Sequence, residues 1–165
     1  MLKKVCNILI GIILIILVAL AGLLFVPKIM GYDMFAVISG SMEPNISVGS
    51  IVYTKPVEFN ELKVNDVIGY KLSEDTMVTH RIVSIDDENK TVTTKGDANE
   101  VEDANPVSEG NIVGKVNFNI PLLGYISLYA KTPLGIAVIC GIVAILIILN
   151  FLPEILEKEE SKNKN

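Results

Sequence analysis

The chain has 165 residues, half of them apolar, and a formal net charge of −5 at neutral pH. This length allows one modest domain once any membrane segments are set aside. The acidic balance excludes nucleic acid and anionic lipid as favoured partners, because both attract basic residues. The two cysteines, Cys6 and Cys140, lie in or beside apolar stretches, so the rest of the chain must fold without disulfides.

The first predicted element is the uncharged run Ile8–Val26. A helix of about 19 residues is roughly 28 Å long, which matches the core of a bilayer. Lys3 and Lys4, followed by an apolar stretch and Ala19-Leu20-Ala21, also resemble a cleavable secretory signal. The apolar run continues beyond that site for a full membrane thickness, which favours an uncleaved anchor.

The middle of the chain is predicted to be mainly β. Short runs rich in Val, Ile, Thr and Tyr alternate with Gly, Asn, Asp and Pro, the pattern of strands and turns. Asp86–Lys90 is predicted to form the tip of a hairpin. The predicted strands are Phe35–Ile38, Ile51–Thr54, Val67–Lys71, Val78–Ile85, Thr91–Thr94 and Ile112–Phe118.

Ser39-Gly40-Ser41-Met42-Glu43-Pro44 follows the first predicted strand. The glycine permits a sharp turn, and a serine at the end of a rigid element is well placed to act as a nucleophile. The ordinary alternative is a turn without chemistry, so this motif needs partners elsewhere in the chain.

His80, the only histidine, lies in Thr79-His80-Arg81 on a predicted strand. Imidazole is the side chain best suited to accept a proton from a serine hydroxyl near neutral pH. The alternative is an exposed histidine on a strand that has no catalytic role. One histidine without exported cysteines falls short of a zinc ligand set, so we expect neither a metal site nor a cofactor.

Lys95–Asp103 contains several carboxylates that could orient an imidazole. The alternative is a solvated turn in which Asp97 and Asn99 cap backbone groups. A calcium loop is disfavoured, because the segment lacks the ligand alternation of an EF-hand.

The last predicted element is a second uncharged run, Leu134–Leu152. A buried core helix is disfavoured here, because so small a domain could hardly surround it. Lys residues before the first run and after the second predict that both termini are cytoplasmic. We therefore expect a cytoplasmic N-terminus, a span, an extracytoplasmic β domain, a second span and a polar tail that is a frayed helix end or disordered, at residues 1–7, 8–26, 27–132, 133–152 and 153–165.

Four ordered motifs resemble the conserved boxes of type I signal peptidases, specifically the endoplasmic-reticulum-type branch, over about residues 35 to 116. They are Ser39-Gly40-Ser41-Met42-Glu43-Pro44, Asn65-Asp66-Val67-Ile68, Thr79-His80-Arg81-Ile82 and Thr94-Lys95-Gly96-Asp97. His80 decides the branch, because the common bacterial enzymes have a lysine base at the corresponding place.

The resemblance implies a signal-peptidase-like β catalytic domain between two transmembrane helices. It implies that Ser41 is the nucleophile and His80 the general base, and that Asp103 orients the imidazole, a role that Asp97 could share. Ser39 would supply its hydroxyl and Ser41 its backbone N–H to the oxyanion hole. Ala98 departs from the family's Gly-Asp-Asn-Asn, so any hydrogen bond from that side chain is missing.

The implied activity is that of a serine endopeptidase of the cell membrane that removes signal peptides after small residues, at sites of the Ala-x-Ala type. Its partners would be preprotein signal peptides and the lipid bilayer, with accessory membrane subunits left unspecified. Two alternatives remain open: a catalytically silent, membrane-anchored β domain that binds exported peptides or a partner protein, and a serine–lysine protease with Lys71 or Lys95 as base.

Overall fold

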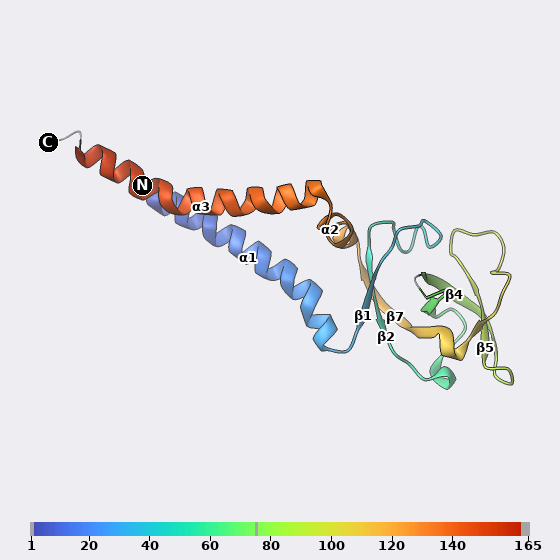
Figure 1. Cartoon of the computed structure of the whole chain (residues 1–165). Coiled ribbons are helices and arrows are strands. Elements are labelled where there is room, and N and C mark those ends of the chain that lie inside the picture. Colours follow the sequence, from blue (N-terminus) through green and yellow to red (C-terminus); the bar gives the residue numbers. More distant parts are fainter. Residues whose placement is uncertain (1, 75, 163–165) are drawn as a thin grey trace. The chain divides into compact units, whose positions relative to one another are not determined.

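The computed structural model describes residues 2–74 and 76–162, and the chain falls into two compact units. One unit is helical and comes from both ends of the chain, and the other is the β unit Pro27–Leu128. Helix α1 covers Leu2–Ile29 and helix α3 covers Pro133–Lys162 (Figure 1). Both contain segments long and apolar enough to cross a membrane, Lys3–Ile29 and Pro133–Pro153.

The helices extend beyond the predicted spans. Helix α3 continues to Lys162, so most of the polar tail is helical by its backbone. The predicted tail also includes residues 163–165, which lie outside the described residues.

The β unit contains one curled antiparallel sheet of seven strands in the order β1-β2-β7-β3-β4-β5-β6 (Figure 1). The prediction of a mainly β domain between two candidate membrane helices is confirmed. The strands are β1 (Asp33–Ala36), β2 (Ile51–Lys55), β3 (Val67–Lys71), β4 (Met77–Asp86), β5 (Thr91–Lys95), β6 (Val107–Ser108) and β7 (Ile112–Ile120).

Five predicted strands match these elements closely, but the first was placed about two residues too late. The pairing of β1 with β2 ends at Ala36 and Ile51. Val37 instead donates its N–H to the Ser50 carbonyl and accepts from the Gly49 N–H, so it lies against the turn that precedes β2. The hairpin tip at Asp86–Lys90 is confirmed, and the Asp86 carboxylate accepts the backbone N–H groups of Glu88 and Asn89.

Four short elements were not predicted. Besides β6 they are the helix α2 (Leu123–Tyr129) and two single-turn 3₁₀ helices at Phe59–Glu61 and Glu109–Asn111. Elements of two to seven residues provide too few positions for a hydrophobic period to be read.

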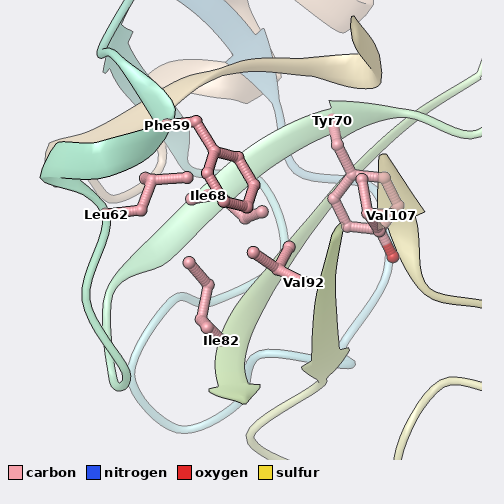
Figure 2. Packing of buried hydrophobic residues seen from close by; sticks show 7 residues of the cluster. All are labelled: Phe59, Leu62, Ile68, Tyr70, Ile82, Val92 and Val107. Carbon is pink, nitrogen blue, oxygen red and sulfur yellow. The ribbon is translucent and has the colours of Figure 1, made fainter. Parts of the chain in front are cut away.

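Two groups of buried side chains hold the β unit together. The larger group fills the space between β3, β4, β5 and the 3₁₀ turn at Phe59 (Figure 2), and its members are Phe59, Leu62, Ile68, Tyr70, Ile82, Val92 and Val107. The smaller group consists of Met42, Ile46 and Val52, and it packs against partly buried apolar side chains including Phe35 and Val37. Because Met42 directly follows Ser41, the smaller group fixes the turn that carries the predicted nucleophile.

Candidate active site

The backbone around Ser41 forms a tight turn anchored from beneath. Met42 and Ile46 are 1% and 4% exposed, and the Ile46 N–H donates to the Met42 carbonyl at 2.9 Å. Burying two large apolar side chains contributes about 1.5–3 kcal/mol each relative to leaving them in water. Ser41 is therefore held in place by Met42 and Ile46, which are both buried in the core.

The side chain of His80 lies between a hydroxyl and a carboxylate. His80 is on β4, opposite Ile68 of β3, and is 8% exposed. Its Nε2 is 3.1 Å from Ser41 Oγ, and its Nδ1 is 2.6 Å from Asp103 Oδ2. With the carboxylate accepting the Nδ1 proton, Nε2 is left free to accept the proton of the serine hydroxyl.

Asp103 is held by more than the imidazole. Its backbone N–H donates to the Thr94 carbonyl at 2.8 Å, which ties the loop after β5 back onto the strand. Thr94 Oγ1 donates to Asp103 Oδ2 at 2.6 Å, and the Tyr70 hydroxyl donates to the same oxygen at 3.2 Å. Three donors, including His80 Nδ1, thus converge on one carboxylate oxygen.

These contacts shift the acidity of the groups involved. Burial raises the pKa of the Asp103 carboxyl, but the hydrogen bonds from Thr94 and His80 outweigh it, so the pKa lies below its ordinary value. Burial is also the main reason why the pKa of the Tyr70 phenol is raised, which keeps its proton available for donation. Asp103 is consequently a carboxylate at neutral pH.

Thr94 and Tyr70 were not singled out as site residues. Thr94 lies in one of the four motifs, so its position carried a signal, and its complete burial explains why its hydroxyl needs a partner. Tyr70 was predicted only as part of a strand. Tyr70 is two residues from Ile68 on β3, so the two side chains could have been placed on the same, buried face. The sequence offered no indication that this face also holds an acid.

Asp97 forms an ion pair with Arg81, whereas the carboxylate next to His80 is that of Asp103. The Arg81 guanidinium donates to both Asp97 oxygens through Nε and Nη2, at 2.8 and 2.7 Å, and Asn45 Nδ2 donates at 2.7 Å. The hydrogen bond from Arg81 lowers the pKa of the Asp97 carboxyl, and the same bond raises the pKa of Arg81. Asp97 therefore fixes the loop that it belongs to.

That loop also holds the backbone of Ser41. The Ala98 N–H donates to the Ser41 carbonyl at 2.9 Å. A Cβ atom on Gly96 would lie 2.6 Å from the same carbonyl oxygen, so only glycine permits this approach. Ala98 donates this hydrogen bond through its backbone N–H, which any residue other than proline could do. The steric requirement lies at Gly96, where a side chain would collide with the Ser41 carbonyl.

The side chain of Ser39 lies next to that of Ser41. Its Oγ is 3.4 Å from Ser41 Oγ, on the exposed side of the turn. The two hydroxyls thus lie side by side, and the role of Ser39 in the oxyanion hole stays a prediction.

The lysines of the alternative mechanism lie elsewhere. Lys95 Nζ points to the Glu100 carbonyl at 3.4 Å, and Lys71 is exposed at the end of β3. His80 is the basic side chain whose hydrogen bond to Ser41 Oγ the structure records.

A groove of about 260 Å³ opens beside Ser41 and His80. Its lining comes from the segment Phe35–Ser39, from Met77–Thr79 of β4, and from Met42 and Ile46. The lining of the groove is mostly apolar.

Comparison with known proteins finds relatives that are similar to more than half of this chain. No family model matches. Signal peptidase I W of Bacillus subtilis (strain 168) is 38% identical over 99 residues, which cover 58% of this chain and 52% of that protein. The chain is related to the type I signal peptidases.

This relationship includes the endoplasmic-reticulum type of signal peptidase. The signal peptidase complex catalytic subunit SEC11 of Ogataea parapolymorpha is 33% identical over 113 residues, 56% of this chain and 64% of that protein. The catalytic subunit SEC11C of Rattus norvegicus is 24% identical over 120 residues, 64% of this chain and 62% of that protein. The predicted resemblance is confirmed, and the chain spans between 52% and 64% of the length of these signal peptidases.

Proposed function

We propose that this protein is a membrane-bound serine endopeptidase that removes signal peptides from exported preproteins after small residues, at sites of the Ala-x-Ala type. The observation that carries the proposal is the continuous series of hydrogen bonds from Ser41 through His80 to Asp103 at the edge of the groove. The names of the related proteins support the same activity.

The proposed reaction is acyl transfer in two steps. Ser41 Oγ attacks the scissile carbonyl carbon while His80 Nε2 takes the hydroxyl proton, and Asp103 stabilises the imidazolium. The oxyanion accepts hydrogen bonds from the Ser39 hydroxyl and the Ser41 N–H. His80 then returns the proton to the leaving amine as the C–N bond breaks, and a water molecule activated by His80 hydrolyses the acyl ester.

The groove supports this choice of substrate. Strand β1 is at the edge of the sheet, so its outer hydrogen-bonding groups can pair with an extended peptide. The groove has a volume of only about 260 Å³ and its lining includes Met42 and Ile46, which supports a substrate with small side chains. Backbone pairing would provide affinity, and the small volume would provide specificity.

The apolar helices support a membrane location. We propose that α1 and α3 span the cell membrane with both termini in the cytoplasm and the β domain on the extracytoplasmic side, as the flanking lysines predict. About 15 residues separate Val26 from Ser41, which keeps the nucleophile close to the membrane surface where a signal peptide emerges.

Purified full-length protein should cleave a model preprotein after Ala-x-Ala, and Ser41→Ala should abolish the cleavage. Binding of the preprotein without turnover would instead support the silent peptide-binding domain. Cleavage that persists in Ser41→Ala would refute the assignment of the nucleophile.

A further inference from the structure

A second cavity lies beside the groove and shares part of its lining. Its volume is about 390 Å³, and Val78 and His80 line both the groove and this cavity. The rest of its lining comes from the end of β3, from the segment between β5 and β6 and from the turn before β7, and includes Tyr70, Lys71, Leu72, residues 103–107 and Asn111. The two cavities therefore meet at the imidazole.

The second cavity differs from the groove in its chemistry. Lys71, Asn105 and Asn111 bring one cation and two amides to its lining, and all three residues are exposed. In the part of the chain that the structure describes, no hydrogen bond or ion pair of these three side chains is recorded. Lys71 also borders a neighbouring cavity that contains Asp33, and these two residues form no ion pair. The three polar side chains are therefore available to a ligand.

The chemistry of cleavage determines which part of a substrate lies at this cavity. In the proposed reaction the acyl part of the preprotein occupies the groove, and His80 Nε2 gives its proton to the leaving amine. That amine belongs to the first residue of the mature segment, so the chain after the scissile bond lies next to the imidazole. One extended residue spans about 3.3–3.6 Å, so the second and third residues of the mature segment can lie within the second cavity.

We propose that the second cavity binds the first residues of the mature segment, and that Lys71 favours a substrate with a carboxylate side chain at the second of these residues. The inference rests on the proposed removal of signal peptides and adds specificity on the other side of the scissile bond. The amides of Asn105 and Asn111 can donate to and accept from the backbone of any such segment. The preference for a charge therefore comes from Lys71.

The expected preference is modest. Lys71 is exposed at the end of β3, and an ion pair between exposed groups is weak because water surrounds both charges. We expect a selectivity of about two- to five-fold between an acidic and a basic side chain. Salt screens such a pair, so the selectivity should decrease with ionic strength.

The overall charge of the protein makes this preference diagnostic. The chain carries a formal net charge of −5, so its long-range field favours a basic substrate over an acidic one. A preference for an acidic mature segment would therefore report the local contribution of Lys71.

The test uses three model preproteins that differ only in the second residue after the Ala-x-Ala site, which is aspartate, asparagine or lysine. The full-length protein cleaves each of them at low ionic strength and at about 1 M salt, where the Debye length is about 3 Å. At low ionic strength we expect kcat/KM to be about two- to five-fold higher with aspartate than with lysine, with asparagine between them. The difference should disappear at high salt.

Lys71→Gln should remove this preference and Lys71→Glu should reverse it. Lys63→Glu is the matched control, because it makes the same change of net charge before β3, at the opposite end of that strand from Lys71. It should keep the order of the three substrates. The ratio of two substrates on one protein does not depend on the fraction of that protein that is folded, so a partly folded variant still gives the answer.

An aspartate-to-lysine ratio that is the same in the unmodified protein and in both Lys71 variants would overturn the inference and leave the proposed function intact. An equal loss of the preference in Lys63→Glu would also overturn it, because net charge would then be the cause. If the unmodified protein cleaves none of the three preproteins, both the proposed function and the inference are refuted.

Discussion

Replacing Thr94 by valine removes one donor to Asp103, together with the 3.4 Å contact between the Thr94 and Tyr70 hydroxyls. Thr94 is fully buried, and valine has nearly the same shape, so the variant loses the 2.6 Å hydrogen bond to Asp103 Oδ2 without leaving a cavity. Asp103 keeps its contacts with His80 and Tyr70. The change therefore isolates the contribution of one hydroxyl to the orientation of the carboxylate.

The expected effect follows from the charge on the acceptor. A hydrogen bond to a charged group contributes about 1.5–3 kcal/mol, and each 1.4 kcal/mol is a factor of ten in rate, so kcat should fall by about 10–100-fold. The Thr94 donor also lowers the pKa of Asp103, so its removal raises that pKa. The acidic limb of the pH–rate profile should consequently move to higher pH.

The assay is preprotein cleavage by the full-length protein, with kcat and KM measured across the acid range. Thr94→Ser retains the hydroxyl and should keep both the rate and the pH profile close to those of the unmodified protein. The reasoning is wrong if Thr94→Val keeps its kcat, or if both variants are equally slow with an unchanged acidic limb, because a purely structural role would produce the latter.

Gly96→Ala should slow cleavage by about 10²-fold, because its Cβ would displace the Ser41 carbonyl, whereas Gly110→Ala meets open space and should keep the rate. Ser39→Ala should reduce kcat by about 10²–10³, the usual cost of one oxyanion donor, and an unchanged kcat would exclude Ser39 from the hole. The lowered pKa of Asp97 means that its ion pair stabilises the folded state above the ordinary carboxyl pKa and that this contribution is lost as pH falls through the lowered value. The thermal midpoint of unfolding should therefore decrease when the pH is lowered below about 4. Asp97→Asn should lower the midpoint at neutral pH and make it depend less on pH in this range. Parallel curves of midpoint against pH for the two proteins would contradict this role.

The strands of the β domain could be predicted because their side chains alternate between a buried and an exposed face. Thr91–Lys95 shows this pattern directly, since Val92 and Thr94 are buried while their neighbours are only partly so. Helix α2 was missed because its seven residues are too few for a hydrophobic period to be read.

The site was predictable to the extent that its residues lie in motifs. His80 is held on β4, whereas Ser41 lies in the turn between β1 and β2 and meets the imidazole through the contact between Ser41 Oγ and His80 Nε2. The choice between Asp97 and Asp103 depended on where the loop after β5 turns back. Because Arg81 and His80 are adjacent on β4 and point to opposite faces, the two aspartates divide between them, a separation fixed by the Asp103 hydrogen bond to the Thr94 backbone.

The most direct test of the proposed mechanism is a double-mutant cycle on preprotein cleavage with Ser41→Ala, His80→Ala and the combined variant. If the imidazole acts by taking the serine proton, each single change should cost about 10⁴–10⁶ in kcat, and the combination should cost no more than either alone. Costs that multiply in the double variant, or a His80→Ala protein that retains its rate, would contradict the account.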